Sequence, residues 1–101
     1  LALAESADAL HVSEPVLDYI QMLVQATRTH AALRAGLSPR ASLAMLKAAR
    51  AHALLQDREF VLPDDVKRIF APLAAHRLQC HPNSGEPEHV VEQILGETPV
   101  P

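Results

Sequence analysis

The amino-acid sequence predicts an all-α fold, a small bundle of four to five helices. Of its 101 residues, 17 are Ala and 15 are Leu, both strong helix formers. Val and Ile together number only 11, and the three aromatic residues are Tyr19, Phe60 and Phe70. A sheet protein would be richer in both classes. Because the length suits one domain with one small core, we expect residues 1–101 to form a single helical domain.

The first two helices are expected over residues 2–9 and 14–30. The first is too short to be stable alone in water. The second starts after Ser13, a favourable N-cap, and has Pro15 in its first turn. Its apolar residues follow helical spacing, and Gly36 marks the region where the helical pattern stops.

The third helix, expected over residues 39–55, has the clearest start in the chain. Ser38 is its N-cap candidate, and Pro39 takes the first helical position. From residue 41 to residue 55 apolar residues lie on almost every side, which is typical of a central, buried helix. Four alanines would let neighbouring helices approach closely: Ala41, Ala44, Ala48 and Ala51.

A fourth helix is expected over residues 63–78, after a turn that contains a short extended piece near 59–62. A proline opens the helix, and Asp64 and Asp65 place acids in its first turn, where they suit the helix dipole. Pro72 lies inside the apolar pattern and is expected to kink the helix.

The C-terminal part is expected to form a loop over residues 79–87 and a short helix over 87–95. The loop segment is rich in Pro, Asn and Gly. The helix has four closely spaced apolar residues, and Gly96 is expected to end it.

Composition and charge argue against several classes of protein. The longest stretch without a charged residue, 19–27, is about half of a bilayer span, so no membrane insertion is expected. The formal net charge of −3 disfavours general nucleic-acid binding. A single cysteine, Cys80, fits a reducing compartment, and we expect a cytoplasmic protein. Because the chain begins at Leu1 rather than Met, we expect it to be cut from a longer protein.

The third helix breaks a rule that the second and fourth obey. It has no acid in its first turn and carries Arg40 there, where a cation faces the positive end of the helix dipole. The free N–H groups of that turn favour an anion, and a guanidinium suits phosphate or carboxylate. Two roles follow for Arg40: it binds an anion, or it pairs with a carboxylate such as Glu14 or Asp65. Lys47 and Arg50 share its side of the helix, as further anion-binding candidates or as an ordinary solvated face.

No catalytic or metal site is evident in the chain taken alone. The three glycines are too scattered for a phosphate-binding loop. Histidines gather near Cys80, between residues 76 and 89, but their spacing matches no structural zinc pattern. Cys80 also lacks a positioned base. We therefore expect no bound metal and no enzymatic activity from this chain on its own.

Six motifs of the chain are similar to those of one known family. They are V-S-E-P-V-L-D-Y-I (12–20), A-T-R (26–28), G-L-S-P-R-A-S-L (36–43), A-A-R-A-H-A-L-L (48–55), R-E-F-V-L-P-D-D-V (58–66) and H-R-L (76–78). On these residues the chain resembles the C-terminal lid of the MoxR family of AAA+ ATPases, most firmly over 12–78. Two positions depart from the family pattern: Asp57 stands in place of Gly, and Leu62 stands in place of the Thr that would cap the fourth helix.

The resemblance implies a helical lid that follows a P-loop ATPase core, which this chain lacks. Arg40, in the S-P-R motif, would be the sensor-2 arginine that contacts the γ-phosphate of ATP, with Ser38 and Pro39 beside the nucleotide. ATP and Mg²⁺ would bind to the longer protein, and the isolated domain is expected to hold neither. The family assembles as rings, usually hexamers. Its members act as chaperone-like machines that mature other proteins, often with von Willebrand A domain partners.

Two other functions stay open from the residues alone. One is a stand-alone helical protein-interaction module. The other is a helix–turn–helix DNA-binding domain with residues 38–55 as the recognition helix, which the net charge and the apolar circumference of that helix disfavour. For Arg28, Arg58 and Arg77, both contact with a neighbouring subunit and pairing or capping within the chain are open.

Overall fold

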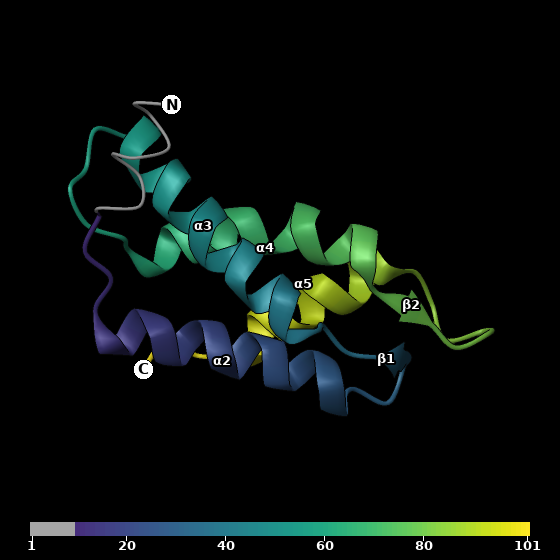
Figure 1. Ribbon diagram of the computed structural model, residues 1–101. Coiled ribbons are helices and arrows are strands. Elements are labelled where there is room, and N and C mark those ends of the chain that lie inside the picture. Colours follow the sequence, from purple (N-terminus) through teal and green to yellow (C-terminus); the bar gives the residue numbers. More distant parts are fainter. Residues whose placement is uncertain (1–9) are drawn as a thin grey trace.

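The structure, a computed structural model, describes residues 10–101 and is a helical bundle (Figure 1). The elements in this range are α2 (Glu14–Thr29), β1 (Leu33–Ala35), α3 (Pro39–Leu55), α4 (Pro63–Arg77), β2 (Gln79–Cys80) and α5 (Pro87–Glu97). The predicted all-α class is confirmed, with one small two-stranded sheet added. The helix predicted over 2–9 lies outside the described residues.

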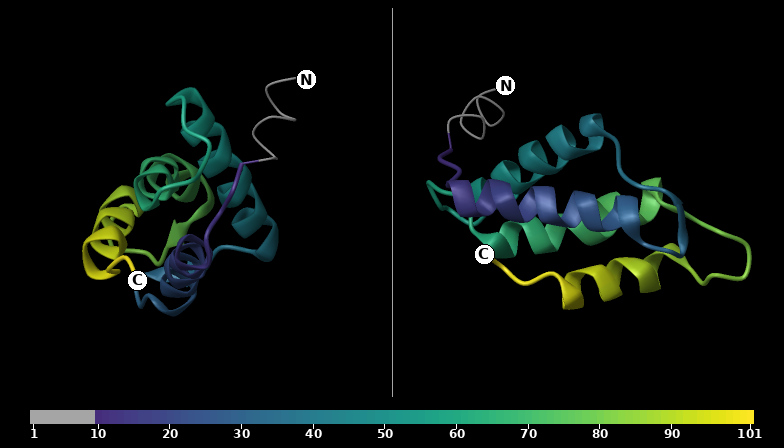
Figure 2. Two further views of the ribbon diagram at one scale, coloured as in Figure 1. Left: turned by 90° about the vertical axis from the view of Figure 1, so that its left-hand side faces the viewer. Right: turned by 90° about the horizontal axis from the view of Figure 1, so that it is seen from below.

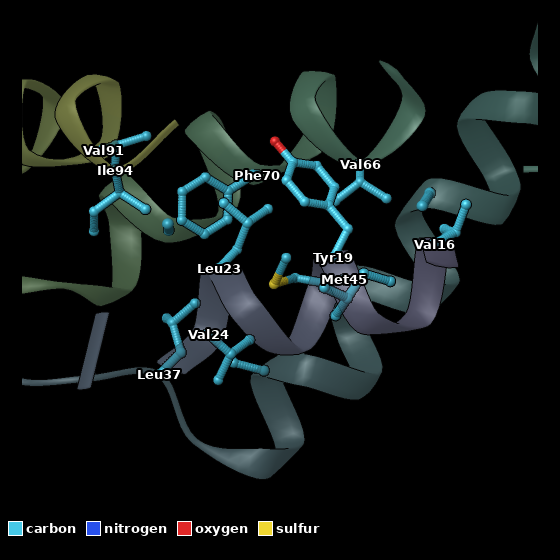
Figure 3. Close-up of a cluster of buried hydrophobic side chains, with 14 of the residues drawn as sticks. Val16, Tyr19, Leu23, Val24, Leu37, Met45, Val66, Phe70, Val91 and Ile94 are labelled. Atoms are coloured by element: carbon cyan, nitrogen blue, oxygen red, sulfur yellow. The ribbon is translucent and has the colours of Figure 1, made fainter. Parts of the chain in front are cut away.

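The four helices of the described range surround a common core when the bundle is viewed end-on (Figure 2). α3 packs chiefly against α4, α4 packs against α5, and α2 contacts the other three helices. Tyr19 and Leu23 of α2, Met45 of α3 and Phe70 of α4 are all fully buried, and their side chains meet between the helices (Figure 3).

The prediction that α3 is buried on almost every side is wrong. Its buried residues form one row, spaced four apart: Ala41, Met45, Ala49 and Ala53. Leu43 is 62% exposed and Leu55 is 68% exposed. The apolar residues on the outer faces of α3 reflect helix propensity, because Ala and Leu are favourable in any helix and much protein surface is apolar.

The small sheet is the main element absent from the prediction. α2 ends at Thr29, and residues 33–35 then pair antiparallel with residues 79–80, which were expected to be a loop. Leu33 faces Cys80 in the pairing, and His81 N–H donates to the Ala32 carbonyl at 2.8 Å. The partners are distant in sequence, so local composition gives no sign of the pairing.

The turn between α3 and α4 runs beside the chain that enters α2. Phe60 forms a parallel bridge with His11, and Val61 N–H donates to the His11 carbonyl at 3.0 Å. The extended piece predicted near 59–62 is therefore a single bridge rather than a strand. Asp57 adopts a φ of 57°, a left-handed conformation that Gly adopts without strain and that Asp tolerates.

The observed ends of the last two helices differ from the predicted ends by one or two residues. α4 runs continuously through Pro72 and stops at Arg77, one residue before the predicted end. α5 was expected to stop at residue 95, yet Gly96 lies within its last turn. The helix ends before Thr98, whose helical conformation is disfavoured because Pro99 follows it.

Candidate site at the start of α3

The first turn of α3 is capped by its own sequence and leaves Arg40 free. The Ser38 hydroxyl accepts from the Ala41 N–H at 3.2 Å, and Pro39 occupies the first helical position. No acid lies in this turn. Arg40 is exposed, and within residues 10–101 its side chain makes no ion pair or hydrogen bond. An unpaired guanidinium therefore stands at the positive end of the helix dipole.

The segment that precedes α3 is held by two side chains of α2. The Thr27 hydroxyl accepts from the backbone N–H of Leu37 at 2.9 Å and donates to the Val24 carbonyl at 2.6 Å. Arg28 Nε donates to the Leu37 carbonyl oxygen at 2.9 Å. Both backbone polar groups of Leu37 are thus paired with consecutive residues of α2. Of the two roles left open for Arg28, the structure shows pairing within the chain.

Gly36 lies directly against the end of α2. A Cβ at this position would lie 2.5 Å from Cα and 2.6 Å from the backbone N of Arg28, closer than side-chain atoms can approach a backbone. Any residue larger than glycine would push the segment away from α2. The glycine of the G-L-S-P-R motif is therefore required for packing.

Two surface hollows are lined in part by residues at the start of α3. One is lined by Gly36, Leu37, Ser38, Ala41 and Arg77. The other lies between α2 and α3, and its lining includes Arg28, Pro39 and Ser42. Arg77 Nη1 also donates to the Leu73 carbonyl at 3.4 Å, within its own helix. Residues from the A-T-R, G-L-S-P-R and H-R-L motifs thus gather around one helix end.

Lys47 and Arg50 lie away from that helix end. At 1.5 Å of rise per residue they are about 10 and 15 Å further along α3 than Arg40. Lys47 is exposed, whereas Arg50 is half-buried, and its Nε has no hydrogen-bond partner in the described part of the chain. The structure therefore does not bring these two residues together with Arg40.

A second polar cluster joins α3 and α4 at the opposite end of α3. Asp65 is fully buried and accepts from Arg58 Nη1 and Nη2, both at 2.5 Å. It also pairs with His52 Nδ1 at 2.6 Å and accepts from the Leu62 N–H at 2.7 Å. The last bond is the half of a capping box that the third helical position supplies, and the half that a Thr hydroxyl at position 62 would supply is missing.

The charges of this cluster stabilise one another. Burial raises the pKa of Asp65, but hydrogen bonds from Arg58, Leu62 and His52 outweigh burial and hold that pKa below its ordinary value. The hydrogen bond to Asp65 in turn raises the pKa of Arg58. Arg58 therefore pairs within the chain, and Asp65 is unavailable to Arg40.

Two kinds of feature are absent from residues 10–101. No group of three or more His, Cys, Asp or Glu side chains in this range could hold a metal ion. Every helix in it is too short or too polar to cross a bilayer.

The AAA lid domain family matches the chain over residues 25–96. The chain belongs to the AAA lid domain family. The match includes Thr27, Arg28, Gly36 and Arg40, so the helix end described above is part of the family's own fold.

Individual relatives extend the comparison. The lid is 35% identical over 96 residues to YeaC, an uncharacterised protein of Bacillus subtilis (strain 168), covering 91% of this chain and 30% of YeaC. It is 32% identical over 114 residues to the protein named Chaperone MoxR1 of Mycobacterium tuberculosis, covering 100% of this chain and 30% of the relative. The similarity to MoxR1 confirms the resemblance to the MoxR family.

A crystal structure of a protein provisionally named an ATPase, from Cytophaga hutchinsonii, has the same fold. It aligns with a TM-score of 0.91 and 25% identity over 96% of this chain and 33% of the other. The lid thus spans about a third of the length of the proteins it matches.

The sequence pointed to Arg40 but not to the hydrogen bonds that hold the segment before it. The ties from Thr27 and Arg28 to Leu37 join positions ten and nine residues apart in different elements. A polar Thr27 at a position of the apolar stripe of α2 was the one available signal, because a buried hydroxyl needs a partner.

Proposed function

We propose that this lid closes over ATP bound by a preceding core domain of a longer MoxR-type AAA+ protein, and that Arg40 contacts the γ-phosphate as the sensor-2 residue. One observation carries the proposal. Arg40 is an exposed arginine with no partner in the described residues, on a helix turn that contains no acid. Such a turn attracts an anion through its dipole and through the Arg40 N–H, which neither the Ser38 cap nor Pro39 takes up, and the guanidinium adds a fork that suits phosphate oxygens.

ATP and Mg²⁺ would be held by the core domain, and this chain would supply Arg40, with Ser38 and Pro39 fixing the helix end beside the nucleotide. When the γ-phosphoryl group transfers, charge on its oxygens is stabilised by cations placed in advance. Arg40 would supply part of that stabilisation. Because it stands on the lid, its contact with the γ-phosphate would also link the position of the lid to the state of the nucleotide.

The biological role follows from the family resemblance. Rings of the longer protein, usually hexamers, would use ATP hydrolysis for chaperone-like remodelling or maturation of partner proteins, including partners with von Willebrand A domains. Lid closure driven by ATP and released after hydrolysis would move neighbouring subunits relative to one another.

The test is ATP turnover by the longer protein with Arg40→Ala. We expect kcat to fall by at least about tenfold, which is less than the effect of about 10³–10⁵ known for arginine fingers. Arg34→Ala is the matched control, because Arg34 is an exposed arginine of β1 with no ion pair or hydrogen bond from its side chain within residues 10–101. Turnover that is unchanged in Arg40→Ala would overturn the assignment.

A further inference from the structure

We infer that Thr27 and Arg28 form a latch that aims Arg40, so that two residues of α2 act as positioning residues for ATP hydrolysis. This inference rests on the proposed role of Arg40. The latch is defined as the four hydrogen-bonding groups already described: the Thr27 hydroxyl, the Arg28 Nε, and the backbone N–H and carbonyl of Leu37.

The Thr27 half of the latch is buried, the Arg28 half is partly buried, and both act on the backbone. Thr27 is 1% exposed and Leu37 is 3% exposed, so water cannot replace the bond between them without opening the packing. A buried N–H that loses its partner is costly. Because the bonds reach the N–H and the carbonyl of the same residue, they fix the orientation of its peptide groups as well as its position.

Few torsions separate the latch from Arg40. Leu37 is held on both sides, Ser38 is fixed by its cap to Ala41, and the ring of Pro39 fixes its own φ. Gly36 lies against Arg28 on the other side of Leu37, which leaves no room for the segment to move toward α2. The backbone is thus constrained from the latch to the first turn of α3.

A phosphate contact depends on such constraint. Misplacing a catalytic contact by about 1 Å can lower a rate by about 10²-fold. The latch ties the start of α3 to α2, so any change in the position of α2 is carried to Arg40. Thr29 is a contrasting residue, because within residues 10–101 its hydroxyl bonds only to the Gln25 carbonyl of its own helix, at 3.2 Å, and it is exposed.

The experiment compares Thr27→Val, Thr27→Ser and Thr29→Val in the longer protein under saturating ATP. Valine keeps the shape of threonine but accepts no hydrogen bond, whereas serine keeps the oxygen. We expect Thr27→Val to lower kcat by about tenfold or more with a smaller change in KM. We expect Thr27→Ser to retain most of the activity and Thr29→Val to match the parent protein.

A double-mutant cycle with Arg40→Ala separates positioning from general destabilisation. If Thr27 acts through Arg40, adding Thr27→Val to Arg40→Ala lowers kcat no further. Arg28→Met provides a second variant that keeps the aliphatic stem but removes the Nε donor, and it is expected to behave as Thr27→Val does, should the latter fold poorly.

Two results would overturn the latch. One is a normal kcat in both Thr27→Val and Arg28→Met while Arg40→Ala is impaired. The other is a full additional loss when either variant is combined with Arg40→Ala. Normal turnover in Arg40→Ala would instead overturn the proposed function itself. Failure of the latch and failure of the proposed function are therefore distinguishable.

Discussion

Arg58 and Asp65 form a two-pronged ion pair, with both guanidinium-to-carboxylate distances at 2.5 Å and the carboxylate fully buried. The pair joins the turn after α3 to the first turn of α4, and His52 of α3 completes it. The neighbouring Asp64 is exposed, although it occupies the same helical turn. Two adjacent acids therefore have different roles.

The first prediction concerns Asp65→Asn. An amide keeps the shape of the carboxylate but leaves the Arg58 charge without its counter-charge, and it weakens the bonds to His52 and to the Leu62 N–H. We expect the free energy of unfolding of the chain to fall by about 3 kcal/mol in chemical denaturation. Asp64→Asn is the control and should change it by less than about 0.5 kcal/mol. Equal effects of the two variants would contradict the structural role of Asp65.

The second prediction concerns pH. The pKa of Asp65 is lower in the folded chain than its ordinary value near 3.9. A group of this kind stabilises the fold above its unfolded pKa, and the stabilisation is lost as pH falls through the folded pKa. The free energy of unfolding should therefore decrease from about pH 5 toward pH 2. Asp65→Asn should show a shallower decrease over the same interval, and parallel curves would count against the Asp65 assignment.

The third prediction uses two glycines in different surroundings. Gly36→Ala places a methyl group against the backbone of Arg28 and should lower the free energy of unfolding by about 1–3 kcal/mol. Gly96 lies in the last turn of α5, and a Cβ there would meet no atom within 4 Å. Gly96→Ala should therefore raise the free energy of unfolding by up to about 1 kcal/mol. Thermal denaturation of both variants would show opposite signs, and a stabilised Gly36→Ala would disprove the close approach.

The fourth prediction concerns nucleotide binding by the 101-residue chain alone. Within residues 10–101 it offers ATP one unpaired arginine at a helix end and no phosphate-binding loop. We expect calorimetric titration with ATP and Mg²⁺ to give binding weaker than about 1 mM, which corresponds to about −4 kcal/mol. Micromolar affinity for the isolated chain would contradict the division of labour between the lid and a core domain.

Local signals predicted the elements that depend on local chemistry. Ser38 and Pro39 placed the start of α3 correctly, because a cap and a fixed φ act within one turn. The charge anomaly at Arg40 was visible for the same reason. The β1–β2 pairing depends on Leu33 meeting Cys80, a contact between distant segments that local pattern cannot reveal.

Buried polar residues were the hardest to interpret from sequence. Asp65 was expected to be a first-turn charge of α4 that suits the helix dipole, or a partner of Arg40, and it is instead fully buried and paired with Arg58 and His52 from other elements. Thr27 was assigned to the apolar stripe of α2 without a partner, and that partner, Leu37, belongs to another segment. Both residues could be recognised only after the fold had brought their partners together.

The most direct test of the central claim is a structure of the longer protein with a non-hydrolysable ATP analogue bound. The account predicts that the guanidinium of Arg40 lies within about 3 Å of a γ-phosphate oxygen, with the Thr27–Leu37 hydrogen bond intact. A closed, nucleotide-bound structure in which Arg40 faces solvent or pairs with a carboxylate would contradict it.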